Sequence, residues 1–562
     1  LNLIIKLKIM KSVLFFILNI FFGISFNVVN AQENDQKPFN VVWISCEDVG
    51  PIMGAYGVDQ IKTPNIDKLA AEGVRYSNAY STVGVCAPSR FSIITSMYPA
   101  RLGAHNMRTG DLNNYKTPEN LTLKTVTNRV DKAGNPIPEY EVVTPEIVKP
   151  FTQYLRAEGY YCINDNKCDY QFNAPFTAWD HTLGSNLFDK IPENQPFFYV
   201  KNSYTTHESR IWLRKDKPLT VFPNEVIVPD YYPDIPEVRN DLAIKYSNIE
   251  ALDKEVGQLL KDLEAKDLLK NTIIFFWSDH GGNLLRQKRA VGNSGLHVPL
   301  IIRYPNMYKA GDVENALVSL MDLGPTVMSL LDIEPPDHTD GQAFAGRYKK
   351  ESRDYIFGSA DRFDESTDMQ RSVLDGRFVY IKNFMTELPL IFRNKYREKV
   401  PMNKKLIDMD INRELSGDAA YIFMKTKPVE ELYDLHTDPY EVHNLVTNPT
   451  YKPKLIELRT ALSKWQTDIN DQGFKAESEI IKGFWPDMIQ PKTSDVNIKI
   501  NSDGLVKMSC DTNGASIGYQ IEEMIGDDRW LLYTEPIKIT STKKLIARAI
   551  RIGFKASNIT SN

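Results

Sequence analysis

The sequence predicts an α/β fold with a mostly parallel central sheet, followed by a smaller α+β subdomain and a small β-sandwich. Three apolar runs of strand length support the sheet, at 39–45, 196–202 and 271–277. The amphipathic segment 241–269 precedes the third run, and alternation of buried strands with helices is typical of parallel sheets covered on both faces. Ligands of such sheets bind beyond the carboxyl ends of the strands, so the residues after each run are the expected place for chemistry.

Length and composition describe a large globular protein. The chain has 562 residues, of which 42% are hydrophobic and 25% charged, and it has no repeat or low-complexity segment. It is too long for one ordinary core, and the composition excludes a disordered or fibrous chain. The net charge is -5 and no long block of Lys or Arg occurs, so nucleic acid is not an expected partner.

The first 31 residues have the pattern of a secretory signal peptide. The apolar run 12–26 follows a basic segment with Lys6, Lys8 and Lys11. Small residues then lead to Ala31, where we expect cleavage, and we expect translation to start at Met10. The alternative is an N-terminal membrane anchor, but the run is shorter than a span requires. We therefore expect a periplasmic or secreted protein without a stable membrane anchor.

Composition divides the rest of the chain into three predicted parts. The first, 38–389, contains the strand and helix alternation. The second, 390–475, is rich in Lys and Asp, with a short strand at 431–435 and a helix near 453–466, so we expect an α+β subdomain. The third, 490–562, has short alternating runs that predict a small all-β module.

The chain has five cysteines, an odd number for a protein expected in an oxidising compartment. Cys162 and Cys168 are the pair closest in sequence. A disulfide between them and two buried thiols are both compatible with this spacing, and we favour two buried thiols.

The strongest motif of the chain is Cys86-Ala87-Pro88-Ser89-Arg90. Pro88 suits the first turn of a helix, so residue 86 is expected at a helix N-terminus, where free amides and the helix dipole attract an anion. A lone cysteine there would be interpreted as a buried thiol. The C-x-P-S-R spacing, however, resembles the type I sulfatases, in which this cysteine is oxidised to formylglycine. The family's usual Gly after Thr95 is Ser96 here.

The resemblance implies a calcium site. Glu47 and Asp48 match the family's first pair of metal-binding acids, usually two aspartates, and Asp279 and His280 match the second pair. Together with Cys86 they would surround a hard cation with mainly oxygen ligands. Solvated loop acids are the alternative for either pair alone. Glu47 in place of aspartate lengthens one ligand.

Four further residues have roles implied by the same resemblance. In the segment 159–169, Lys167 matches a sulfate-binding lysine, whereas Asp169 replaces the family's histidine and would orient Lys167 or bind substrate. His207 follows the second apolar run and matches the histidine that protonates the leaving alcohol. Lys288 stands where the family places a Lys or Arg after its Asp-His-Gly turn. A surface position is the alternative for Lys167.

The implied catalytic set is therefore Cys86, Arg90, Lys167, His207 and Lys288. Three other residues near the motifs are predicted, with Asp169, to contact the sugar: Arg289, His105 and His297. For each of these two histidines, a loop or packing role is the alternative.

The resemblance covers about residues 40–472 and implies an alkaline-phosphatase-like sulfatase fold. It is greatest to the branch with heparan N-sulfatases and bacterial polysaccharide sulfatases. Segments at 514–519, 532–533 and 545–549 are similar to a fibronectin-associated or chitobiase C-terminal β module. The implied substrate is a sulfated oligosaccharide from an algal glycan such as ulvan, or from a glycosaminoglycan. The implied maturation partner is a formylglycine-generating or anaerobic sulfatase-maturing enzyme.

Two alternative functions remain from other classes. A phosphatase or phosphodiesterase can share this superfold, but would need a Ser or Thr nucleophile and more histidine ligands for zinc. A non-catalytic glycan-binding homologue is the second alternative. Only the C-terminal module and Asp169 favour it.

Overall fold

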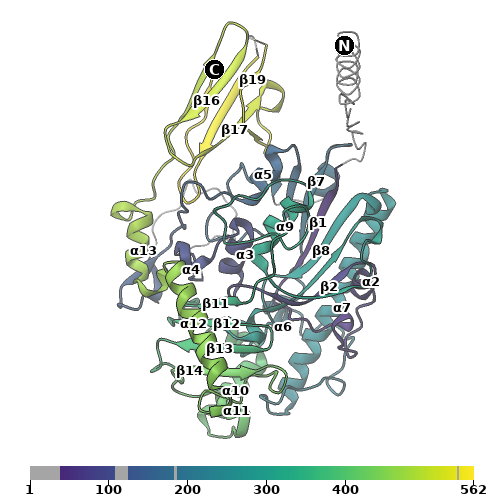
Figure 1. The fold of residues 1–562 in the computed structure, drawn as a ribbon, viewed down its shortest axis with the longest axis vertical. Coiled ribbons are helices and arrows are strands. Elements are labelled where there is room, and N and C mark those ends of the chain that lie inside the picture. The colour runs from purple at the N-terminus through teal and green to yellow at the C-terminus, as the bar shows by residue number, and fades with distance from the viewer. Residues whose placement is uncertain (1–37, 108–124, 183–186, 541–542) are drawn as a thin grey trace, which may run out of the picture. The chain divides into compact units, whose positions relative to one another are not determined.

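The computed structural model describes residues 38–107, 125–182, 187–540 and 543–562 (Figure 1). The predicted signal peptide, with its cleavage site at Ala31, lies outside these residues. Within the described ranges, no helix is long and apolar enough to cross a membrane.

An eight-stranded sheet contains the three predicted strands side by side, in the order β10-β2-β9-β8-β1-β7-β5-β6. Its strands are β1 (Asn40–Cys46), β2 (Val74–Tyr80), β5 (Tyr161–Asp165), β6 (His181–Thr182), β7 (Phe197–Asn202), β8 (Thr272–Ser278), β9 (His297–Arg303) and β10 (Val313–Ser319). β9 is antiparallel to both neighbours, whereas the other strand pairs are parallel. The prediction of a mostly parallel sheet is confirmed.

Helices cover both faces of this sheet. Consecutive side chains of a strand point to opposite faces, so each buried strand contributes to two cores. Trp43 of β1 packs in a core with α3, α5 and α9, whereas Ile44 packs in a core with α2 and α7. The bounds of these helices are α2 (Pro64–Ala71), α3 (Cys86–Thr95), α5 (Phe151–Ala157), α7 (Pro236–Ala265) and α9 (Leu323–Leu330). The predicted amphipathic helix 241–269 is α7. Burial on both faces explains why β1, β7 and β8 are continuous apolar runs.

A second sheet is antiparallel, in the order β11-β12-β13-β14. Its strands are β11 (Ile356–Ala360), β12 (Gln370–Leu374), β13 (Phe378–Asn383) and β14 (Glu430–Asp434). Helix α12 (Lys452–Asp468) runs beside this sheet (Figure 1). Its Leu458, Leu462 and Trp465 pack in a core with residues of the sheet. The predicted strand 431–435 and helix 453–466 are β14 and α12. The boundary predicted at residue 390 divides this sheet, since β11 to β13 precede it.

Shorter elements connect these layers. They are β3 (Thr125–Val130), β4 (Pro136–Pro138), α4 (Pro99–Leu102), α6 (Ser209–Leu213), α8 (Asn293–Leu296), α10 (Pro401–Ile411), α11 (Gly417–Tyr421) and α13 (Glu477–Phe484).

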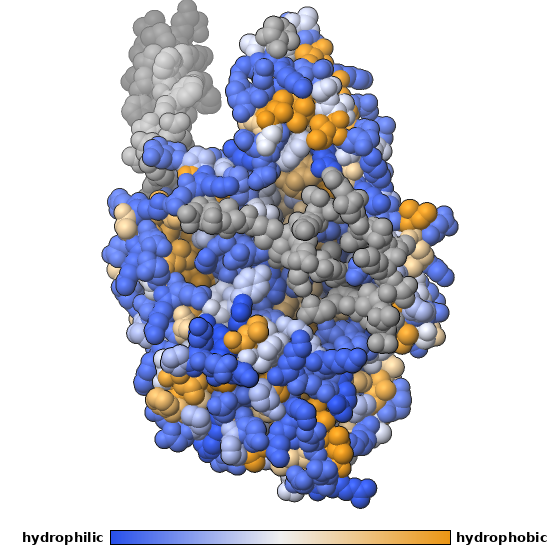
Figure 2. All heavy atoms as spheres, turned by 180° about the vertical axis from the view of Figure 1, so that it is seen from behind, coloured by the Kyte–Doolittle hydropathy of each residue, from blue (hydrophilic) through white to orange (hydrophobic). Residues whose placement is uncertain are grey.

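Figure 2 shows a mainly hydrophilic face on which apolar residues form small separate groups, as on other globular proteins. All five cysteines are free, and Cys162 and Cys168 are buried, which agrees with the prediction of two buried thiols instead of a disulfide.

The C-terminal part contains two small antiparallel sheets, ordered β15-β16-β19 and β18-β17-β20-β21. The strands are β15 (Val496–Ile500), β16 (Leu505–Cys510), β17 (Ser516–Ile521), β18 (Leu531–Leu532), β19 (Ile537–Lys538), β20 (Leu545–Ile550) and β21 (Thr560–Ser561). Val506 and Met508 of one sheet share a core with Ile517 and Ala547 of the other. The predicted all-β character is confirmed. The similarity to a fibronectin-associated or chitobiase module stays a prediction.

Candidate active site

Three neighbouring strands bring polar residues to one edge of the central sheet. Glu47 and Asp48 follow β1, Asn202 ends β7, and Asp279 and His280 follow β8. β1 is parallel to both β7 and β8, so the carboxyl ends of the three strands meet. Asp48 has a φ of 59°, in the left-handed region, and the chain turns there directly after the strand.

Cys86 is the first residue of α3 and lies beneath this edge, 2% exposed. Its Sγ is 3.4 Å from His280 Nε2, 3.6 Å from Lys288 Nζ and 4.0 Å from Asp48 Oδ1. Ser89, in the next part of the motif, donates a hydrogen bond of 2.5 Å to the backbone carbonyl of Asp279. The motif therefore joins the helix N-terminus to the end of β8.

Arg90 connects all three strand ends. Its Nε donates to Asp279 Oδ2 at 3.1 Å, its Nη1 donates to Asn202 Oδ1 at 3.0 Å, and its Nη2 lies 3.8 Å from Glu47 Oε1. A buried guanidinium is costly unless it is paired and hydrogen-bonded, as here. Although burial opposes it, the charges of His280 and Arg90 lower the pKa of Asp279 to about 2.

The carboxylates at this edge have the spacing of a metal site. Asp48, Cys86, Asp279 and His280 place one potential ligand atom each within 4.8 Å of one another, and Glu47, Asp48, Cys86 and His207 form a second such group. Both oxygens of Glu47 are buried, and their partners among the described residues are the charges of Lys167, at 3.0 Å, and Arg90, at 3.8 Å, without a hydrogen bond to either oxygen. Burial raises the pKa of Glu47 in spite of these two cations. A hard cation would give these oxygens a direct ligand contact, and carboxylate oxygens suit calcium.

Lys288 and Lys167 bring positive charge to the same place. Lys288 Nζ donates to both oxygens of Asp48, at 2.9 and 2.8 Å, and lies 3.3 Å from Glu208. Lys167 Nζ lies 3.0 Å from Glu47 Oε2 and 3.6 Å from Asp169 Oδ2. Burial disfavours both ammonium groups, but the surrounding anions raise the pKa of each. Both lysines are therefore charged next to Cys86.

The loop that carries Lys167 passes through the left-handed region at Asn166, which has a φ of 82°. Asparagine tolerates this region better than most residues, so it suits this position of the loop. Asp169, with a φ of 54°, replaces the family's histidine and pairs with Lys167 instead.

His207 lies just before α6 (Ser209–Leu213), and its side chain is 13% exposed. Its Nε2 is 3.4 Å from Lys288 Nζ and 3.8 Å from Glu47 Oε2, and its Nδ1 is 2.9 Å from Ser209 Oγ. Burial, followed by the charge of Lys288, lowers the pKa of His207 to about 3. The imidazole is therefore uncharged in this structure. The ring of Tyr396 lies 6.4 Å from it, between centroids.

Arg289, predicted to contact the sugar, is engaged inside the protein. Its guanidinium pairs with both oxygens of Glu208 at 3.1 Å and with Asp364 Oδ2 at 2.9 Å. Arg289 and Lys288 lower the pKa of Glu208 to about 2, although burial opposes this shift. The backbone N–H of Glu208 also donates to Asp48 at 2.6 Å. This geometry supports a positioning role for Arg289 and gives no support to a sugar contact.

The two remaining predicted sugar contacts lie apart from the catalytic cluster. His297 pairs with β2, where its Nε2 hydrogen-bonds the carbonyl of Ser77 at 2.8 Å and its ring stacks on Tyr80 with centroids 4.8 Å apart. His105 is 2% exposed, and its Nδ1 has no hydrogen-bond partner within the described part of the chain. The structure therefore favours the packing alternative for His297 and shows no contact between His105 and the cluster residues it describes.

Two residues of the site have no role in the sequence-based prediction. Asn202 accepts from Arg90 and Ser45 through Oδ1 and donates to Asn164 through Nδ2. Its position at the end of an apolar run is a signal that could have identified it. Glu208 binds Arg289 and Lys288, and only its place next to His207 indicated it.

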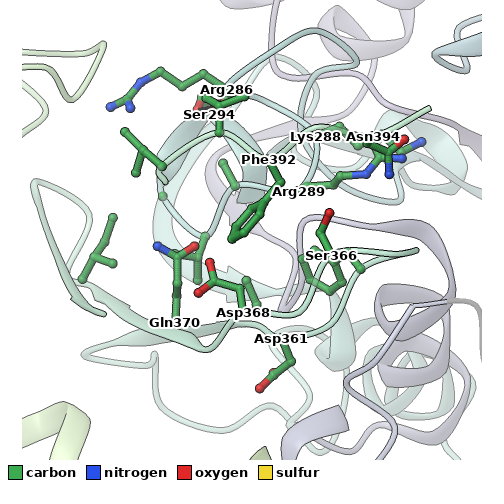
Figure 3. Close-up of a pocket in the computed structure, with 18 of the residues that line it drawn as sticks. Arg286, Lys288, Arg289, Ser294, Asp361, Ser366, Asp368, Gln370, Phe392 and Asn394 are labelled. Atoms are coloured by element: carbon green, nitrogen blue, oxygen red, sulfur yellow. Dashed lines mark hydrogen bonds between the residues drawn. The ribbon is translucent and has the colours of Figure 1, made fainter. Parts of the chain in front are cut away.

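A small cavity adjoins the site, between the segment 286–294 and the sheet β11–β14. Figure 3 shows Phe392 close to Asp368 and Gln370 on its wall, with Arg289 and Asn394 near one end. Its volume of about 80 Å³ corresponds to two or three waters at roughly 30 Å³ each. It is too small for a monosaccharide.

Fold and site together define a class of enzyme. Cys86 stands in the nucleophile position at a helix N-terminus, three buried cations surround it, and three carboxylates can hold a hard cation beside it. Such a site fits hydrolysis of an anionic ester.

Comparisons with known proteins identify the family. The model of the Sulfatase family matches residues 39–333, more than half of the chain. The ulvan-active sulfatase of Formosa agariphila is 38% identical over 563 residues, which cover 92% of this chain and 90% of that protein. The N-sulphoglucosamine sulphohydrolase of Homo sapiens is 25% identical, over 81% and 95% of the two chains. The chain belongs to the sulfatase family, and the prediction of a sulfuric ester hydrolase is confirmed.

Solved structures confirm the predicted sulfatase fold. A 2-O GAG sulfatase superposes with a TM-score of 0.54 at 20% identity, covering 78% of this chain and 95% of its own. A sulfatase in complex with its substrate D-glucosamine-2-N,6-O-disulfate superposes with a TM-score of 0.52 at 17% identity, covering 78% and 100%.

Proposed function

We propose that this protein is an exported, calcium-dependent sulfatase that removes sulfate groups from oligosaccharides of a sulfated polysaccharide. The observation that carries the proposal is Cys86, in the C-x-P-S-R motif, at the N-terminus of α3 and beside His280 and Lys288. The pattern of residues 1–31 supports export to the periplasm or the medium.

Formylglycine at residue 86 would supply the nucleophile. Its hydrated aldehyde offers one hydroxyl for attack on sulfur and a second from which the carbonyl re-forms as sulfate leaves. Cys86 is 2% exposed in the folded chain, so a maturation enzyme needs access before the site closes. The expected partner is a formylglycine-generating or anaerobic sulfatase-maturing enzyme.

Calcium would be held by Glu47, Asp48, Asp279 and His280, next to residue 86. The ion supplies positive charge to the sulfate oxygens and to the attacking hydroxyl. Arg90 holds Asp279 in place, and its own charge faces the same cluster.

The lysines and His207 act on the sulfate ester. Lys167 and Lys288 are charged, buried and fixed by carboxylates, so they stabilise negative charge on sulfate without reorganisation. His207 would hold at Nε2 the proton that passes to the leaving alcohol. A bound anionic sulfate raises the pKa of this imidazole above its low value in the free protein.

The proposed substrates are sulfated sugars from ulvan or from a glycosaminoglycan. Similarity to the ulvan-active relative, over nine-tenths of both chains, supports the first, and similarity to the human N-sulphoglucosamine sulphohydrolase supports the second.

The proposal is tested by incubating the matured protein with defined sulfated oligosaccharides from both glycans and with matched sugar phosphates. We expect inorganic sulfate from at least one oligosaccharide and little phosphate. Release of phosphate without sulfate would replace this proposal by the phosphatase alternative, and release of neither would favour a glycan-binding homologue.

Removal of calcium is expected to lower both activity and thermal stability. Without the ion, Glu47, Asp48 and Asp279 repel one another in a buried site, and ligand binding at one hundred times Kd stabilises the native state by about 2.7 kcal/mol. Activity and Tm are measured with chelator, after re-addition of calcium, and in Asp279→Asn. This Asp279→Asn variant should show no calcium-dependent rise in Tm. A chelated wild-type protein with full activity and unchanged Tm would contradict the calcium site.

A further inference from the structure

Two aromatic rings from segments far apart in the sequence meet beside His207. Trp212 follows His207 in α6, and Tyr396 directly precedes the short 3₁₀ turn Arg397–Lys399. The rings of Trp212 and Tyr396 have centroids 5.1 Å apart and planes at 83°, an edge-to-face contact. The centroid of Tyr396 lies 6.4 Å from that of the His207 imidazole. Both aromatic side chains are half-buried, so part of each reaches solvent next to the candidate active site.

Hydrogen bonds hold Tyr396 in this position. Asn394 Oδ1 accepts from the N–H groups of Tyr396 and Arg397, at 3.0 and 2.9 Å. Asn394 Nδ2 donates to Asp364 Oδ2 at 3.1 Å, and Arg397 Nη2 donates to the backbone carbonyl of Lys288 at 2.7 Å. The turn that carries Tyr396 is therefore tied to the chain at Lys288. A ligand that packs on a ring held in this way loses little free energy to the ordering of the protein.

Lys399 brings a cation to the same two rings. Its side chain is exposed, and its Nζ lies 5.2 Å from the centroid of Tyr396 and 5.8 Å from that of Trp212. An ammonium group within about 6 Å of an aromatic centroid is attracted by the ring. We refer to Trp212, Tyr396 and Lys399 together as the aromatic platform.

The chemistry of the platform suits a sugar that carries an anionic group. The C–H groups on a pyranose face have a slight positive charge and pack against the negative face of an aromatic ring. A carboxylate or sulfate on the same sugar, or on the next one, would pair with the ammonium of Lys399. A free inorganic anion has no apolar face to place on Trp212 and Tyr396.

The direction of the His207 imidazole connects the platform to the reaction. Its Nε2 faces Lys288 and Glu47, at 3.4 and 3.8 Å, and its Nδ1 faces Ser209. The ester oxygen that takes a proton from Nε2 is bonded to a sugar, so that sugar also lies against the imidazole. The ring of Tyr396, which is next to the imidazole, is therefore within reach of the same sugar.

We infer that the aromatic platform binds the sugar from which sulfate is removed, and that Lys399 pairs with a further carboxylate or sulfate on the oligosaccharide. That this sugar is the reacting one rests on the proposed function, whereas sugar binding can be measured without turnover. The alternative is a packing role, since Trp212 also packs against the core that contains α7 and α10. A packing role predicts a loss of Tm without a selective loss of sugar binding.

The experiment compares three platform variants with a matched control, all in the full chain. The platform variants are Tyr396→Leu, Tyr396→Phe and Lys399→Gln. The control is Tyr308→Leu with Lys309→Gln, where Lys309 Nζ lies 5.8 Å from the ring centroid of Tyr308, 62% exposed. These two residues follow the end of β9, which pairs with the start of β8, away from the strand ends that form the site.

Binding is measured by calorimetry in the Cys86→Ser background, with tetrasaccharides of ulvan and of chondroitin sulfate and with uncharged cellotetraose. In the matured protein, kcat and KM are measured on the same sulfated tetrasaccharides and on an aryl sulfate. The Tm of every variant is measured in parallel. If the matured protein releases no sulfate, the proposed function fails, while calorimetry still decides on the platform.

We expect Tyr396→Leu to weaken binding of a sulfated tetrasaccharide roughly tenfold, the scale of losing one aromatic contact at a binding site. Tyr396→Phe keeps the ring and should bind like the parent chain. Lys399→Gln should weaken binding about threefold, the scale of one exposed ion pair, and this loss should shrink with added salt. In the matured protein, Tyr396→Leu should raise KM more than it lowers kcat, and the loss should be larger on the tetrasaccharide than on the aryl sulfate.

Four results would each overturn the inference. They are tetrasaccharides that do not bind the Cys86→Ser chain, equal binding by Tyr396→Leu and its parent, equal loss in Tyr396→Phe and Tyr396→Leu, and equal loss in the control. Cellotetraose bound as tightly as the sulfated tetrasaccharides, or unchanged binding in Lys399→Gln, would remove the role of Lys399. A lower Tm in Tyr396→Leu alone leaves the decision to Tyr396→Phe and Lys399→Gln.

Discussion

Cys86→Ser is expected to remove turnover while the protein remains folded. Serine fits the space of the cysteine at the N-terminus of α3, so the hydrogen bonds of Ser89 and Arg90 to Asp279 should persist. Its single hydroxyl can attack sulfur, but no second hydroxyl then exists from which a carbonyl could form and expel sulfate. Loss of a catalytic nucleophile costs about six orders of magnitude in kcat in a well-studied case, and we expect a loss of at least about four.

Released sulfate, Tm and intact mass check this result together. Cys86→Ala serves as the matched control, because it has no nucleophile and fills less space. Both variants should keep the wild-type Tm within a few degrees, and the serine variant alone could retain one sulfate per chain. Sustained turnover by a Cys86→Ser protein in which mass spectrometry shows the introduced serine to be unmodified would contradict the proposed release step.

His207→Ala is expected to slow hydrolysis of sugar sulfates by about two to four orders of magnitude, the range of general acid catalysis, and to spare aryl sulfates. A sugar alcohol is a poor leaving group and needs a proton, whereas a phenolate can leave without one. The position of Nε2, 3.4 Å from Lys288 and 3.8 Å from Glu47, places the imidazole beside the proposed sulfate site.

The ratio of the two activities, measured at equal calcium content, separates an acid from a structural histidine. His443→Ala, on an exposed side chain that lies 3.7 Å from Asp438, is the matched control and should change neither activity. Equal losses on sugar and aryl sulfates in His207→Ala would exclude the leaving-group role. Attention would then move to Lys288, whose Nζ lies 3.4 Å from His207 Nε2.

The elements found from sequence are those with a local signal. β1, β7 and β8 are continuous apolar runs because both faces of the sheet are covered, and their ends follow from the polar residues after them. β9 and β11 to β13 lack such a signal. β9 contains Pro299 and pairs antiparallel with the preceding strand β8 and with the distant strand β2, and β13 pairs with β14 across some fifty residues. Strand pairing of this kind is a non-local property that periodicity does not reveal.

The residues of the site divide in the same way, into those with a local sequence signal and those whose roles depend on distant partners. Cys86, Arg90, Asp48 and Asp279 belong to motifs, and the structure places them together. The partners that engage Arg289 and Arg90 are Glu208 and Asn202, which lie 81 and 112 residues away along the chain. No local pattern indicates that Arg289 is occupied by an internal carboxylate, so the sequence-based prediction assigned it to the sugar.

The mass of the peptide that contains residue 86, measured on a preparation with demonstrated sulfate release, tests the central claim most directly. The account predicts that the cysteine sulfur is absent and that residue 86 carries an aldehyde or its hydrate, in proportion to the specific activity of each preparation. Full activity in a preparation whose residue 86 is only unmodified cysteine would contradict it.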